Sequence, residues 1–174
     1  GISRSGQTAT VAAGGMGVFN MSGGFLTNTG NRILVGNSGV GQANISGSAW
    51  VYTTTGLRIG HTNLVVANTN VFNLNGGTVT TPFVENGASG AGVGTNIFNF
   101  NGGTLRPTAN SATFMRGLSA INVWQGGAII DTTNFNIAIG QSLQAATGNG
   151  VTNISLTAGG SGYYGPPLVL ISGG

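Results

Sequence analysis

A nine-residue segment, VFNLNGGTV at residues 71–79, recurs along this chain and constrains its fold more than any other feature. A close copy, IFNFNGGTL, covers residues 97–105, and VFNMSGGFL covers residues 18–26. Weaker copies are QANISGSAW at residues 42–50 and INVWQGGAI at residues 121–129. Such internal self-similarity is the signature of a repeat protein.

The spacing of the copies identifies the kind of repeat. Steps of 24, 29, 26 and 24 residues separate their first glycines, which are Gly23, Gly47, Gly76, Gly102 and Gly126. This step is too short for a propeller blade, and neither a leucine-rich frame nor helical spacing is present. It suits one turn of a solenoid, in which short strands joined by tight corners stack on the previous turn. We therefore predict an all-β, parallel β-solenoid (β-helix) of about five to six turns with 24–29 residues per turn.

Apolar residues recur at two phases of the repeat and predict a continuous core. The first predicted core column is Met21, Ile45, Leu74, Phe100 and Trp124. The second is Leu26, Trp50, Val79, Leu105 and Ile129.

A third column contains asparagine at Asn20, Asn44, Asn73 and Asn99, and Val123 breaks the series. Stacked amides can bond to one another from turn to turn, as in cross-β ladders. We interpret this column as structural rather than as a binding site.

The glycines indicate where each turn changes direction. Asn75-Gly76 and Asn101-Gly102 are pairs that also form hairpins, but hairpins would not repeat one residue type at one phase in every unit. A second apolar segment in each turn ends at a glycine, at Gly36, Gly60, Gly117 and Gly140. At least two strands per turn are expected, with a third where the step is 26 or 29 residues.

Composition limits the function. The 174 residues are 40% hydrophobic and suffice for one domain with a core, despite 34 glycines. Lysine is absent. Cysteine is also absent, and its absence excludes disulfides and thiolate metal sites. Five dispersed arginines are too few for a nucleic-acid surface, and no apolar run is long enough to span a membrane. We expect no nucleic-acid partner, no membrane span, no cofactor and no metal.

Few residues are available for catalysis. Glu85 and Asp131 are the only acids and His61 is the only histidine. The two acids fall at different points of different turns, so a glycosidase pair is not expected. His61 follows a corner glycine and would need an orienting acid and a nucleophile to act as a base. We predict that the chain is not an enzyme, with an active site on a neighbouring domain as the weakest alternative.

One segment carries a family resemblance. VGNSGVGQANISG at residues 35–47, followed by Trp50-Val51, resembles the repeats of bacterial autotransporter-associated β-strand proteins and of similar long secreted surface proteins. The resemblance covers roughly residues 17–143. It implies a parallel β-helix and export to the bacterial cell surface, and it transfers no catalytic residue.

The two ends of the chain differ from the repeats. Residues 1–152 are assigned to the solenoid, and residues 153–174 to a Gly/Tyr/Pro-rich unit that ends the array or links it to another. Strands suited to edge pairing are expected at both ends, with Gln7, Thr8, Ala9, Thr10 and Val11 at one and Leu168, Val169, Leu170 and Ile171 at the other.

These features predict a non-catalytic, extracellular structural protein that forms a bacterial surface fibre by end-to-end strand stacking with identical subunits or neighbouring repeats. The alternative is an adhesin or carbohydrate-binding module with a polysaccharide partner.

Overall fold

In the computed structural model, the described residues form eighteen short strands in three parallel sheets. Described are residues 2–4, 9–11, 15–37, 39–61, 68–87, 90 and 93–147, with the first two segments described by their backbone alone. Sheet A contains β1 (Ile2–Arg4), β4 (Phe25–Asn28), β7 (Trp50–Thr53), β10 (Thr78–Thr81), β13 (Thr104–Pro107) and β16 (Ile129–Ile130). Sheet B contains β2 (Ala9–Val11), β5 (Ile33–Val35), β8 (Leu57–Ile59), β11 (Val84–Asn86), β14 (Ser111–Arg116) and β17 (Ile137–Ile139). Sheet C contains β3 (Met16–Met21), β6 (Val40–Ile45), β9 (Thr69–Leu74), β12 (Thr95–Phe100), β15 (Ala120–Val123) and β18 (Leu143–Ala145).

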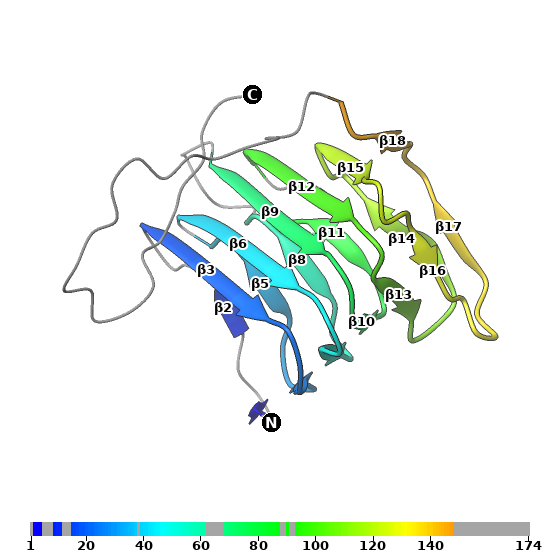
Figure 1. Ribbon diagram of the computed structural model, residues 1–174, viewed down its shortest axis with the longest axis horizontal. Coiled ribbons are helices and arrows are strands. Elements are labelled where there is room, and N and C mark those ends of the chain that lie inside the picture. The colour runs from blue at the N-terminus through cyan, green and yellow to red at the C-terminus, as the bar shows by residue number, and fades with distance from the viewer. Residues whose placement is uncertain are drawn as a thin grey trace.

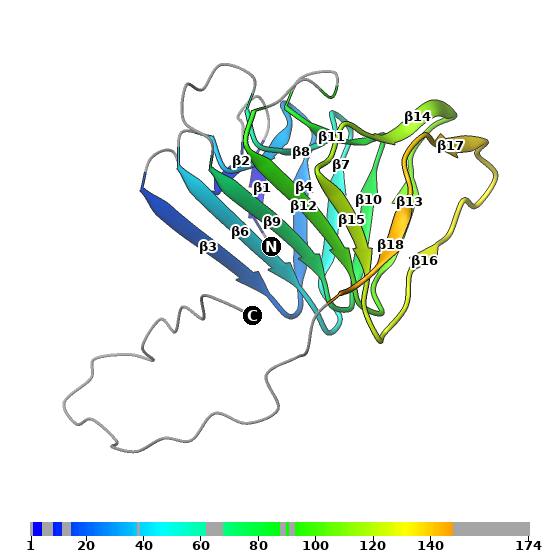
Figure 2. The same ribbon diagram turned by 90° about the horizontal axis from the view of Figure 1, so that it is seen from above.

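Each strand from β4 to β15 pairs in parallel with the strands three places before and after it in the chain, and each terminal strand pairs with one of them. The chain thus winds through sheets A, B and C once per turn, as Figures 1 and 2 show from two directions. The predicted all-β parallel solenoid is confirmed. A third strand is present in the shorter described turns as well as in the longer ones where it is expected, so every turn exceeds the predicted minimum of two. Two strands of three to six residues cannot close a turn of this length, and the short strands of sheet B supply the missing side.

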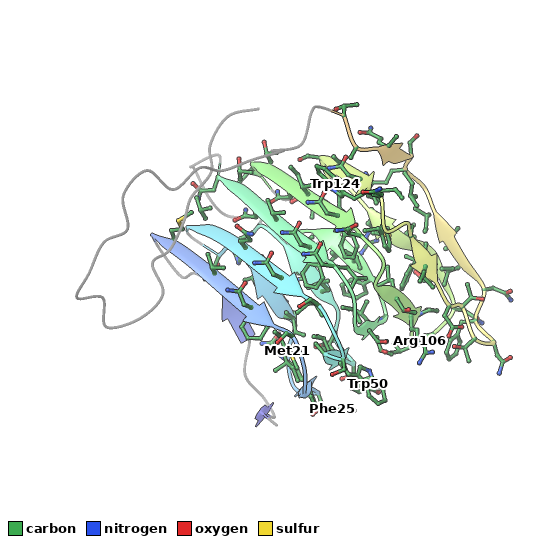
Figure 3. The ribbon with its side chains drawn as sticks, in the orientation of Figure 1. Met21, Phe25, Trp50, Arg106 and Trp124 are labelled. Atoms are coloured by element: carbon green, nitrogen blue, oxygen red, sulfur yellow. The ribbon has the colours of Figure 1, made fainter. Side chains whose placement is uncertain are left out.

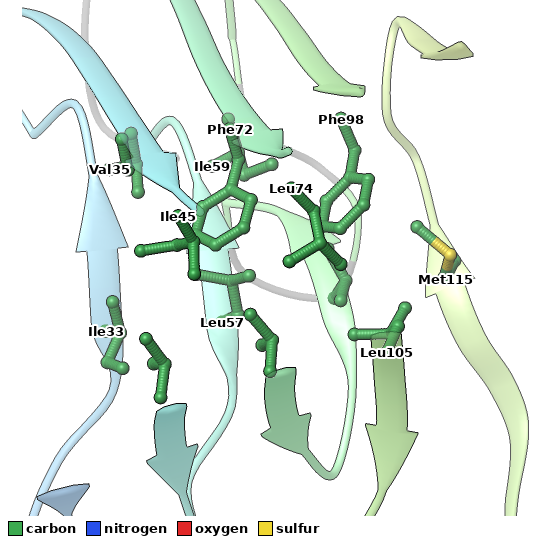
Figure 4. Close-up of a cluster of buried hydrophobic side chains, with 14 of the residues drawn as sticks. Ile33, Val35, Ile45, Leu57, Ile59, Phe72, Leu74, Phe98, Leu105 and Met115 are labelled. Carbon is green, nitrogen blue, oxygen red and sulfur yellow. The ribbon is translucent and has the colours of Figure 1, made fainter. Parts of the chain in front are cut away.

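The core fills the space between the three sheets (Figure 4). Strand β9 alternates as expected for one buried face, with Phe72 and Leu74 buried and Val71 and Asn73 half-buried on the outside. Phe72 stacks on Phe98 of the next turn with ring centroids 5.2 Å apart. Burial of one such side chain is worth about 1.5–3 kcal/mol, so the stacked columns dominate the stability of the solenoid.

The first predicted core column is confirmed at Ile45, Leu74 and Phe100, which are fully buried. Met21, in the first turn, is half-buried against the same cluster. The prediction that Trp124 belongs to this column is wrong. Val123 pairs with Phe100 in register, and the Trp124 side chain is 44% exposed in the following corner.

The second column is confirmed at Val79 and Leu105, and Leu26 packs partly against the core. The predictions for Trp50 and Ile129 are wrong, because Val51 pairs with Val79 and Ile130 pairs with Leu105. The corner between sheets C and A has three residues in the close copies, four before Trp50 and five before Ile129. A shift of one residue moves a strand side chain to the opposite face.

The glycine corners connect different sheets. Gly76 and Gly102 have positive φ angles of 145° and 91°, which their asparagine-glycine pairs favour. The chain then continues into sheet A instead of folding back on itself, which excludes the hairpin alternative.

Ala9, Thr10 and Val11 form β2 at the edge of sheet B, as the edge-strand prediction requires. The predictions for Gln7, Thr8, Leu168, Val169, Leu170, Ile171 and the unit at residues 153–174 lie outside the described residues.

Candidate functional site

An asparagine ladder crosses the outer face of sheet C. Asn44 donates its side-chain amide to Asn20 at 2.6 Å, Asn73 to Asn44 at 2.7 Å and Asn99 to Asn73 at 2.6 Å. All four predicted members are thus connected in one direction. Asn122 also donates to Asn99 at 2.9 Å. The ladder therefore continues through Asn122. The interpretation that Val123 breaks the series is wrong, because Asn122 pairs in register with Asn99 and Val123 pairs with Phe100. Because the amides bond to one another, the geometry supports a structural role.

A second asparagine network lies inside the solenoid and was not predicted. Asn70 donates to Asn96 at 2.8 Å, and Asn96 donates to Asn86 at 2.7 Å. Oδ1 of Asn70 accepts the backbone amide of Gly41 at 2.9 Å. Asn70 and Asn96 are 3% and 0% exposed. Their phase in TNVFNL and TNIFNF, two residues before a core phenylalanine, could have identified them as inward-facing. This network satisfies backbone groups at the corner between sheets B and C.

Glu85 is fully buried in sheet B between two arginines from neighbouring turns. Arg58 Nε lies 2.6 Å from Oε1 of Glu85, and Arg116 Nη2 lies 2.5 Å from Oε2. The three residues are aligned by the register of β8, β11 and β14. Both carboxylate oxygens therefore accept charge-assisted hydrogen bonds within the fold. This arrangement suits a structural ion cluster better than an acid that contacts substrate.

The other residues considered for catalysis lie elsewhere. Asp131, after β16, pairs with Arg106 at 2.9 Å, and both side chains are about two-fifths exposed. His61 follows β8, and its carbonyl oxygen accepts the amide of Val93 at 3.3 Å. Within the described ranges, no three residues of the metal-binding types come together. The absence of catalysis, metal and cofactor remains a prediction.

An aromatic surface lies on the outer face of sheet A (Figure 3). Phe25 and Trp50 are 46% and 38% exposed, and their ring centroids are 4.2 Å apart at an interplanar angle of 54°. Beside Trp50 is an open depression of about 360 Å³, which Ser48, Thr78 and Arg106 also line. Polar groups next to an exposed aromatic side chain form a candidate binding site at this depression.

The ends of the three sheets form a different kind of surface. Among the described residues, strands β16, β17 and β18 end the sheets on one side, and β1, β2 and β3 end them on the other. Leu143 in β18 pairs in register with Ile121, which is fully buried, yet Leu143 is 39% exposed. The apolar column of the core is thus partly exposed at the last of the described turns.

The part of the chain that the structure describes contains no helix able to cross a membrane. No protein family, curated protein or solved structure matches this chain.

Proposed function

We propose that this chain is a non-catalytic structural segment of an extracellular bacterial fibre, in which solenoids stack end to end. The observation that carries the proposal is the open core column at Leu143. An apolar side chain that the repeat buries in every central turn is left 39% exposed where the sheets end. Such exposure favours contact with a further turn.

Continuing the strand register beyond the last described turn would let one end of the solenoid pair with the other end of a second copy. If β18 of one copy pairs in parallel with β3 of the next, the register places Leu143 against Phe19 and Ala145 against Met21. Leu143 would then lie between Ile121 of its own copy and Phe19 of the next, so its apolar side chain would be covered on both sides. Sheet A would continue from Ile130 to Ile2 in the same way.

Unpaired strand edges are normally protected by charges or by a covering element. The sequence has only Arg4 before Arg32 and no charged residue after Asp131. A head-to-tail contact of this type does not close on itself and produces filaments. The neighbour can be an identical copy or further repeats of the same polypeptide. The extracellular, bacterial location rests on the resemblance of residues 35–47 to surface-protein repeats.

The test uses two lysine substitutions at equally exposed positions. Leu143→Lys places a charge in the proposed contact, whereas Val93→Lys, also at 39% exposure, places one in a lateral loop. We expect wild type and Val93→Lys to form filaments in electron microscopy and to sediment faster at higher concentration, in low and high salt alike. Leu143→Lys should remain monomeric. Monomeric wild type at every concentration and salt level, or filaments of Leu143→Lys, would overturn the proposal.

A further inference from the structure

We infer that the outer face of sheet A around Trp50 is a binding site for a neutral polysaccharide, in which a pyranose ring stacks on the indole. This inference does not depend on end-to-end assembly, because the site lies on a lateral face.

The exposed aromatic pair is not required by the solenoid. In the register of sheet A, Phe25 pairs with Trp50, and the same outward position holds Thr78 and Thr104 in the next two turns. The fold therefore accepts a small hydroxylated residue there. Keeping Phe25 and Trp50 at 46% and 38% exposure leaves apolar surface in water that the fold does not need. Contiguous exposure of this kind marks an interaction site.

The indole is held in position before any ligand arrives. Trp50 Nε1 donates to Thr80 Oγ1 at 3.2 Å, which ties the side chain across β7 to β10. Phe25 contacts the ring from the preceding turn. Because Trp50 is held between two turns, little side-chain entropy is lost on binding.

Polar groups are placed beside the ring. Ser48, Thr78 and Arg106 line the depression next to Trp50 and offer hydroxyl and guanidinium groups to sugar hydroxyls. Gly77, in the adjoining corner, also lines it, and a Cβ at Gly77 would overlap the carbonyl oxygen of Ala49. The corner backbone therefore forms part of the depression. An aromatic platform with a few convergent polar groups suits a ring with one apolar face and hydroxyl edges.

The charge around the depression favours a neutral ligand. Arg106 is paired with Asp131 at 2.9 Å, so the formal charges of this pair cancel. The two arginines that bind Glu85 belong to sheet B, which is a different side of the solenoid. A uronic acid or sulfated chain would gain no net attraction here, whereas uncharged hydroxyl groups can still bond to the guanidinium and threonine groups.

The chain's two tryptophans allow a direct test. With excitation selective for tryptophan, the fluorescence of Trp124→Phe reports Trp50 alone, and that of Trp50→Phe reports Trp124 alone. Both proteins are titrated with hexasaccharides of β-1,4-linked glucose, mannose, xylose and N-acetylglucosamine, and with polygalacturonate as the charged comparison. We expect at least one neutral oligosaccharide to change the fluorescence of Trp124→Phe saturably and to leave that of Trp50→Phe unchanged.

Affinity electrophoresis in the corresponding polysaccharide gives the matched mutational control. Trp50→Ala should bind about tenfold more weakly, which is the loss expected for one stacking contact. Trp124→Ala removes a similarly exposed indole that lies elsewhere on the surface (Figure 3), and it should bind like wild type. Circular dichroism confirms that each variant is folded, and repeating the titration in Leu143→Lys separates binding from assembly. Equal binding by Trp50→Ala, preference for polygalacturonate, or no saturable response to any neutral sugar would overturn the inference.

Discussion

At the corner between sheets B and C, the Asn70 side chain occupies the position that a Cβ at Gly36 would take, so an added Cβ would overlap Oδ1 of Asn70. That oxygen already accepts the amide of Gly41 at 2.9 Å, and Asn70 is 3% exposed. The asparagine therefore has no room to move without leaving a buried backbone amide unpaired. The glycine that ends β5 is required both for its backbone conformation and for the buried amide network of the next turn.

Gly36→Ala should accordingly lower the free energy of unfolding by about 3 kcal/mol or more, through strain and a displaced buried hydrogen bond. Gly24→Ala is the matched control. Gly24 has a φ of 79° against 74° for Gly36, but nothing lies within 4 Å of its Cβ position. It should lose only about 1 kcal/mol. Urea unfolding followed by circular dichroism measures both. Equal losses would show that the overlap with Asn70 is relieved at no cost.

Replacing an asparagine in the middle of the ladder should lower the free energy of unfolding more than replacing the asparagine at its end. Asn73 donates to Asn44 and accepts from Asn99, whereas Asn20 only accepts from Asn44 within the ladder. At about 0.5–1.5 kcal/mol per hydrogen bond, Asn73→Ala should destabilise the solenoid by about 1–2 kcal/mol. Asn20→Ala should cost about half as much. The same unfolding measurement applies, and a larger loss at Asn20 would contradict a structural role for the ladder.

The buried and exposed ion pairs should respond very differently to neutralisation. Glu85→Gln removes the fully buried carboxylate that Arg58 and Arg116 share, and the two arginine side chains are only 18% and 36% exposed, so we expect a loss of about 1.5–3 kcal/mol. Asp131→Asn breaks a pair whose side chains are 43% and 40% exposed and should cost less than about 1 kcal/mol. Thermal unfolding of the two variants beside wild type tests this. If Glu85→Gln unfolds at nearly the same temperature as wild type, the ion cluster contributes little to stability.

Substitution of a buried and of an exposed phenylalanine should affect the free energy of unfolding very differently. Phe98 is fully buried and packs against Phe72 and Phe100, so Phe98→Ala should cost about 3–5 kcal/mol. Phe25→Ala removes a ring that is 46% exposed and should cost less than about 1 kcal/mol. Urea midpoints give the comparison. A costly Phe25→Ala would show that the sheet A aromatic surface serves stability rather than ligand binding.

The sequence alone determined the architecture and the central core columns. In the copies at residues 71–79 and 97–105 the corner has the same length and the asparagine-glycine pair is retained. Equal corners keep strands in phase, so Leu74 above Phe100 and Val79 above Leu105 follow from alignment of the copies. The ladder from Asn20 to Asn99 follows for the same reason. When successive copies have equal lengths, residues at the same position in each copy stack on one another, so the repeat itself predicts these contacts.

The tertiary structure decided the register wherever a corner differs in length. Trp50, Trp124 and Ile129 lie outside the core because their corners contain one or two extra residues, and the period of two in a strand converts such a shift into a change of face. The same register brings Phe25 against Trp50 and places Glu85 between Arg58 and Arg116, which are 27 and 31 residues away in the chain. Such pairs depend on how many residues each corner holds, and the repeat pattern does not determine that number.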